Sequence, residues 1–196
     1  MQQPVLLGRR LLRNRLRRMW SHSFTALALL LAIGQTTQAV PESGNEYAVK
    51  AAFLFHFAQL TTWPPQTFAH ADSPMVFCTI GKDPFDGMLD SAVASKTVQG
   101  HPAKVRHLKQ TAALEGCNLL FVGAQEMSQM PALVVALHGL PVLTVGETGE
   151  FLKQGGMIDF RFQSERLRFD VNLEAAQSNN LAFSSTLLSL AQMVTH

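Results

Sequence analysis

The sequence predicts a three-layer, doubly wound α/β domain with a mainly parallel sheet and an antiparallel hairpin at its C-terminal edge. Short, solidly apolar runs alternate with helical patterns, which is typical of parallel strands buried on both faces between crossover helices. Nearer the C-terminus, apolar and polar residues alternate in two neighbouring runs, which indicates half-buried antiparallel strands. With 196 residues, 47% of them hydrophobic, the chain suits one domain and is not intrinsically disordered.

Residues 1–39 have the pattern of a signal peptide. They hold six arginines and no acidic residue, then an apolar stretch at 24–33 and the small-residue sequence Thr37-Gln38-Ala39. A membrane anchor is the alternative, but a spanning helix needs about 20 apolar residues, twice the length of this stretch. We therefore expect export, cleavage after Ala39, and a single domain at 40–196 with no direct membrane insertion after cleavage.

The charges are unevenly divided between these two parts. Of the 16 basic residues, six lie in 1–39, which leaves ten against all 14 acidic residues and a net charge of −4 for the domain. Duplex affinity depends on Lys and Arg that neutralise phosphates. We therefore expect no nucleic-acid partner.

The first element of the domain is a helix at 46–62. Its apolar face is expected to consist of Val49, Phe53, Phe57 and Leu60. The sequence Trp63-Pro64 ends it, because a residue before proline avoids the α region. Aromatic residues lie on more than one face of this helix, so Phe53, Phe55, Phe57 and Trp63 are candidates for an interface with a partner or a second copy. The alternative is that they belong to the core.

Four strands are expected to follow, at 75–80, 103–108, 118–122 and 141–145. Helices are expected between or after them at 84–94, 128–137 and around 150–154. Asp83 is predicted to cap the helix at 84–94, and a turn at 99–102 precedes the second strand.

The last third of the domain changes pattern. The runs 157–162 and 167–171 form the predicted hairpin, with Asp159 and Asp170 on its polar face, where they could form a carboxylate pair. A short helix at 173–178 is capped by Asn172, and a final helix is expected at 185–194.

Three predicted strands end in glycine, at Gly81, Gly123 and Gly146. In open α/β sheets ligands bind beyond the carboxyl ends of the strands, where glycine lets them approach the backbone. These glycines are therefore candidate ligand-binding positions. The alternative is that each one only permits a tight turn.

No arrangement of residues indicates catalysis. The histidines of the domain show no zinc-site spacing, and no serine lies in a Gly-x-Ser-x-Gly elbow. We therefore predict no catalytic residue, no metal site, no cofactor and no enzyme activity. Cys78 and Cys117, the only cysteines, are expected to form a disulfide in an exported protein, with two buried free thiols as the alternative.

The order and spacing of several runs together resemble the YfiR family, also described as the DUF4154 domain. The runs are 46–57 followed by Trp63-Pro64, 78–81 with 83–85, 116–117 leading into 120–122, 141–145, 155–160 and 167–172. The resemblance covers about residues 46–194. It implies a periplasmic α/β domain that dimerises and a disulfide that links Cys78 to Cys117.

The resemblance also implies a function. The best-known relative is a periplasmic repressor that binds the periplasmic domain of a membrane diguanylate cyclase and thereby lowers cyclic di-GMP and biofilm formation. That relative has a second cysteine pair, which is absent here, so redox control through that pair does not transfer. We therefore expect a periplasmic regulatory or sensory protein that binds an inner-membrane signalling protein. The alternative is a small-molecule binding protein with its ligand at the strand ends.

Overall fold

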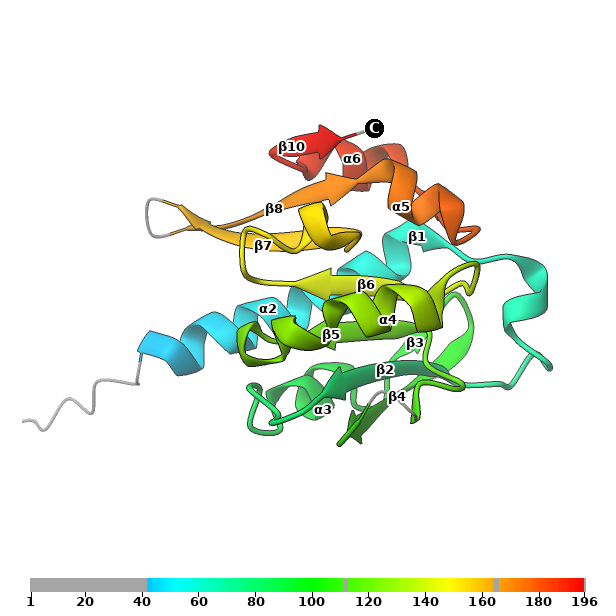
Figure 1. The fold of residues 1–196 in the computed structure, drawn as a ribbon. Helices are drawn as coiled ribbons and strands as arrows, with labels where there is room; N and C mark the ends of the chain where they lie inside the picture. Colours follow the sequence, from blue (N-terminus) through cyan, green and yellow to red (C-terminus); the bar gives the residue numbers. More distant parts are fainter. Residues whose placement is uncertain (1–41, 111–112, 164–165, 196) are drawn as a thin grey trace, which may run out of the picture. The chain divides into compact units, whose positions relative to one another are not determined.

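The computed structural model describes residues 42–110, 113–163 and 166–195, which form a mixed sheet with helices on both faces (Figure 1). The predicted signal peptide lies outside the described residues. The eight strands run in the order β10-β8-β7-β6-β5-β2-β4-β3. The bounds are β2 Met75–Ile80, β3 Thr97–Val98, β4 His101–Leu108, β5 Leu119–Val122, β6 Leu143–Gly146, β7 Ile158–Gln163, β8 Arg166–Asn172 and β10 Met193–Thr195. Two short strands, β1 (Thr61–Thr62) and β9 (Ala182–Phe183), pair separately.

The centre of the sheet is parallel, from β7 through β6, β5 and β2 to β4. The hairpin β7–β8 is antiparallel, as predicted, and β3 pairs antiparallel with β4 at the other edge. The turn between β3 and β4 is confined to Gln99 and Gly100, both with positive φ. The predicted α/β fold class is confirmed.

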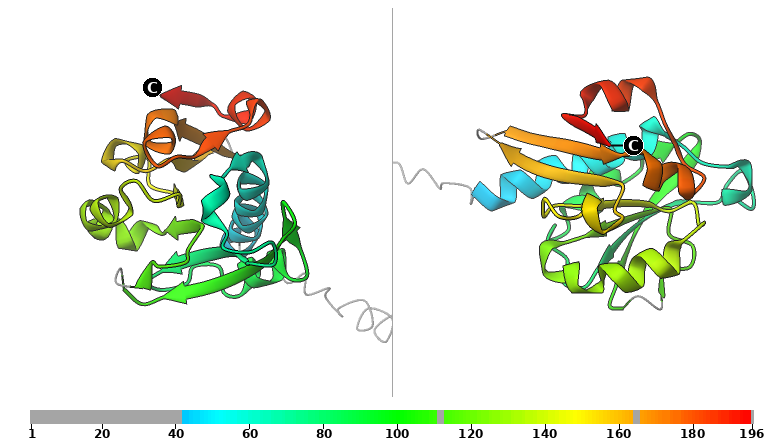
Figure 2. Two further views of the ribbon diagram at one scale, coloured as in Figure 1. Left: turned by 90° about the vertical axis from the view of Figure 1, so that its right-hand side faces the viewer. Right: turned by 45° about the horizontal axis from the view of Figure 1, so that its top comes forward.

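Helices cover the two faces of the sheet, and Figure 2 shows α2 and α4 on opposite sides of it. The helices are α2 Glu42–Leu60, α3 Met88–Val93, α4 Met130–Leu137, α5 Leu173–Ser178 and α6 Ser185–Leu190, with 3₁₀ turns at η1 Pro65–Thr67, η3 Ala124–Gln129 and η4 Leu152–Gln154. Successive strand residues point to opposite faces. Phe77 and Phe121 therefore join α2 in one core, whereas Leu120 joins α4 in the other.

The most buried stripe of α2 differs from the predicted one. Leu54 and Phe57 are buried, whereas Val49 is 38% exposed and Phe53 is half-buried. Because α2 packs against a twisted sheet and also against α3 and α6, its buried surface follows the neighbouring elements rather than a single ideal face.

Some predicted helices begin or end at other residues. Helix α2 covers Glu42–Leu60 rather than 46–62, because Thr61 and Thr62 pair with β9 as strand β1. Helix α3 begins at Met88, after Gly87 in the left-handed region, and the carboxylate of Asp83 instead accepts a bond from the Phe85 N–H at 3.1 Å. The predicted helix at 185–194 stops at Leu190, and β10 follows it. The free edge of β8 provides backbone partners for this segment, since Met193 pairs with Asp170 and the Gln192 N–H donates to the Phe169 carbonyl at 2.9 Å.

Candidate functional site

A cavity of about 510 Å³ lies at the carboxyl ends of β2 and β5. Parallel strands bring these ends to one edge of the sheet, which is the usual ligand position in such folds. The lining residues come from four separate segments: Tyr47, Lys82, Asp83, Pro84, Asp86, Gly123, Ala124, Gln125, Glu126 and Glu147.

The three glycines at the strand ends have different surroundings. Gly123 lines the cavity, and a Cβ there would lie 3.6 Å from the Glu147 carboxylate. Gly81 has φ +78° and lies directly against the Glu126 side chain, so a Cβ there would collide with it. At Gly146 the Phe151 ring occupies the corresponding space. Side chains of the domain therefore occupy the space beside Gly81 and Gly146. Of the three glycines, Gly123 is the one that lines the cavity.

A buried ion cluster borders this cavity. The Lys50 ammonium lies 2.6 Å from Glu147 Oε2 and 2.5 Å from Glu46 Oε1. The other Glu147 oxygen accepts hydrogen bonds from the Tyr47 hydroxyl at 3.2 Å and from the Ala124 N–H at 3.1 Å. The side chains of Lys50 and Glu147 are only 5% and 7% exposed. The cluster therefore connects α2 to the loops that follow β5 and β6.

The cluster shifts the acidity of its tyrosine. Burial disfavours the phenolate, and the negative charge of Glu147 opposes it further, which raises the pKa of Tyr47 to about 12. The hydroxyl therefore stays protonated and donates to Glu147 throughout the physiological range.

This cluster was not predicted from the sequence, although one signal for it was present. Lys50 precedes Leu54 by four residues and Phe57 by seven, so it lies on the stripe of α2 that is otherwise apolar. A lysine on such a stripe indicates a buried charge that needs a carboxylate partner. The partner is Glu147, which lies 97 residues further along the chain, so the spacing of residues within the helix does not predict it.

The hairpin carries a second set of buried carboxylates. Asp159 and Asp170 face each other across β7 and β8, as predicted for the polar face, and both are nearly inaccessible. Arg161 lies between them, with Nε 3.2 Å from Asp170 and Nη1 3.9 Å from Asp159. Burial raises the pKa of Asp159, while the Thr148 and Gly149 N–H groups and Arg161 oppose the rise.

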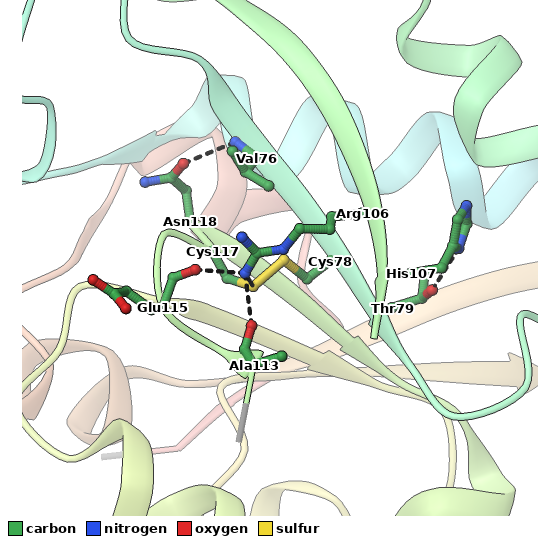
Figure 3. Close-up of a disulfide and its surroundings, with 9 residues drawn as sticks. All are labelled: Val76, Cys78, Thr79, Arg106, His107, Ala113, Glu115, Cys117 and Asn118. Atoms are coloured by element: carbon green, nitrogen blue, oxygen red, sulfur yellow. Dashed lines mark hydrogen bonds between the residues drawn. A yellow bond between two sulfur atoms is a disulfide. The ribbon is translucent and has the colours of Figure 1, made fainter. Parts of the chain in front are cut away.

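Cys78 and Cys117 form a disulfide, with Cα atoms 5.9 Å apart (Figure 3). It joins β2 to the segment before β5 on the α4 face of the sheet. Arg106 from β4 lies beside it and donates to the Ala113 and Glu115 carbonyls at 2.7 and 2.5 Å. The disulfide and Arg106 together hold the segment that leads into β5, which is a structural role.

The aromatic residues proposed for an interface lie in the interior. Phe57 packs on Phe169 with ring centroids 4.8 Å apart, and Phe53 contacts Phe160 at 6.0 Å. Phe55 is 8% exposed, and the Trp63 indole donates to the Pro141 carbonyl at 3.0 Å. Phe55, Phe57 and Trp63 are thus buried and Phe53 is half-buried, so these side chains expose little apolar surface, and an interface at them stays a prediction.

Within the described ranges, no group of three or more His, Cys, Asp or Glu residues is arranged to hold a metal ion. In the same ranges, no helix has the length and apolar character needed to cross a membrane.

Comparison with known proteins supplies the context for this geometry. A family model described as YfiR/HmsC-like (DUF4154) matches residues 47–192, from the first turns of α2 to the residue before β10. No curated protein matches the chain. The family is one of periplasmic regulators rather than enzymes, and the match covers most of the chain. On this basis the chain belongs to the YfiR/HmsC-like family.

Proposed function

We propose that this protein is a periplasmic regulator that binds the periplasmic part of an inner-membrane signalling protein, such as a diguanylate cyclase, and holds its activity down. The family match over 47–192 is the observation that carries this proposal. The signal-peptide pattern of residues 1–39 supports export, and the disulfide suits an oxidising compartment. A homodimer is part of the proposal because the family resemblance implies one.

Co-purification tests this proposal. The chain, tagged at its C-terminus because the N-terminal segment is expected to be cleaved, is recovered from detergent-solubilised envelope after mild crosslinking. We expect a membrane protein with a cyclase, kinase or similar signalling domain to come with it. Recovery of the protein alone would contradict docking onto such a partner.

A second candidate function follows from the cavity at the strand ends. Its volume of about 510 Å³ is within the range of small-molecule sites, and buried charged groups border it. A ligand that binds only the folded chain would raise the melting temperature. A panel of metabolites measured by thermal shift tests this function, with Gly123→Leu as the variant in which the cavity is obstructed.

A further inference from the structure

One face of the β7–β8 hairpin carries a row of charged and polar pairs. Directly opposed residues share a face, and the register pairs Asp159 with Asp170, Arg161 with Arg168, and Gln163 with Arg166. Gln192 reaches this face from the segment before β10 and donates to Gln163 at 2.8 Å. We call the residues Arg161, Gln163, Arg166, Arg168 and Gln192 the arginine face.

Positive charge is left over on this face. The buried carboxylates of Asp159 and Asp170 neutralise Arg161. Among the described residues, no carboxylate lies within ion-pair distance of Arg166 or Arg168, and both are exposed. Glu165 lies outside the described residues. Among the described residues of this face, Arg161, Arg166 and Arg168 carry three positive charges against the two carboxylates of Asp159 and Asp170.

The placement of Arg168 has a cost for the hairpin itself. It lies directly opposite Arg161, and like charges in this position destabilise a strand pair, an effect that the two carboxylates beside Arg161 reduce. Such a local conflict is typical of residues that serve a function rather than the fold. The guanidinium groups of Arg166 and Arg168, which have no carboxylate partner among the described residues, present planar forks of N–H donors that match carboxylates.

The surroundings of the face resemble a docking site. A hollow of about 470 Å³ lies at Arg166 and Arg168, and a second one of about 550 Å³ adjoins it through Gln163 and Gln192. Phe162, Leu190 and Met193 at the rims are 58%, 61% and 46% exposed. Arginine combined with exposed aromatic and aliphatic side chains is the composition enriched in protein interfaces.

We propose that the arginine face binds an acidic segment on the periplasmic part of the membrane partner. This inference depends on the proposed function and adds the docking surface and the chemistry of the partner. The charge complementarity is local, because the domain as a whole has a net charge of −4. An acidic segment is therefore attracted at the arginine face, whereas the net charge of the domain opposes its approach, and this difference orients the complex.

The test uses a charge reversal and a matched control. Arg166→Glu/Arg168→Glu is compared with Lys104→Glu/Lys109→Glu, which changes the net charge equally at exposed lysines on and next to β4, away from the hairpin. Recovery of the partner is measured by co-purification from envelope. We expect about tenfold lower recovery for the arginine variant and no change for the lysine variant.

A labelled decaglutamate peptide is a probe that does not need the partner. Its affinity for the purified chain, measured by fluorescence anisotropy, should fall about tenfold in the arginine variant. The affinity of the unmodified chain should also fall between about 20 and 150 mM NaCl, because salt screens exposed charges. Arg166→Gln/Arg168→Gln provides a second variant if the charge reversal lowers the melting temperature.

The outcomes separate the two proposals. If the unmodified chain retains a membrane signalling protein and the arginine variant retains it equally, the docking surface is wrong and the proposed function stands. If the unmodified chain retains no membrane signalling protein, the proposed function fails. If the unmodified chain and the arginine variant bind the decaglutamate peptide equally, the inference of an acidic ligand is wrong as well. Binding to vesicles of phosphatidylglycerol that is lost in the arginine variant, without peptide binding, would identify a membrane surface instead.

Discussion

Replacement of Lys50 by methionine should destabilise the domain strongly. Methionine keeps the unbranched apolar stem but removes the ammonium that lies 2.6 Å from Glu147. The Glu147 carboxylate would then remain buried without its cationic partner, and that is the costly way to break an internal ion pair.

The structure places the expected loss at the lower end of the range for buried pairs. Glu147 keeps two donors, the Tyr47 hydroxyl and the Ala124 N–H, and Glu46 on the other side of Lys50 is partly exposed. We expect a loss of about 3 kcal/mol in the free energy of unfolding. The double variant Lys50→Met/Glu147→Gln should lose about 1.5 kcal/mol less than the sum of the two single variants, because it buries no unpaired charge.

Urea denaturation at neutral pH with the disulfide intact measures these differences. The exposed Lys104→Met is the control and should change the stability by less than about 0.5 kcal/mol. A loss below about 1 kcal/mol for Lys50→Met would refute the reasoning, because it would mean that the cluster behaves as a hydrated surface pair.

Three further predictions concern the Tyr47 hydroxyl, the disulfide and the cap of α5. Tyr47 is the only tyrosine in the chain, so phenolate absorbance after rapid pH jumps should show a midpoint near 12 in the folded state and about 10 in urea. Because the folded pKa is the higher one, the stability contributed by this group is fully present below pH 10 and is lost as the pH rises toward 12; equal midpoints in the two states would contradict the buried hydroxyl. Replacement of both Cys78 and Cys117 by serine should cost about 4 kcal/mol, from the loop of 39 residues that the disulfide closes, and an unchanged urea midpoint would show that the disulfide does not constrain the unfolded chain. Asn172→Ala should cost about 1 kcal/mol, since its side chain accepts from the Ala175 N–H at 3.0 Å; a thermal melting temperature equal to that of the unmodified chain would argue against the cap.

Local patterns predicted most of the fold. The solid apolar run at 75–80 became β2 with the predicted bounds, and Asn172 caps α5 as expected. The alternation at 157–171 correctly predicted the hairpin, including the shared face of Asp159 and Asp170. These features depend on residues close together in the chain, where side-chain period and backbone preference act directly.

The end of the chain shows where such patterns fail. Residues 191–194 continue a helical pattern, yet β10 begins at Met193 because the edge of β8 offers backbone partners. Local propensity is weak compared with a set of backbone hydrogen bonds supplied by another element.

For the candidate site, local sequence patterns predicted where the strands end, and the two cysteines were expected to pair, with free thiols as the alternative that the disulfide excludes. The tertiary structure decided which groups surround the strand ends. Lys50 and Glu147 are 97 residues apart and meet because the first turns of α2 lie beside the loops that follow β5 and β6. Spacing along the chain predicts which residues are neighbours within one helix or strand. A buried charge such as Lys50 is paired with a residue of another element, so the packing of the elements determines its partner.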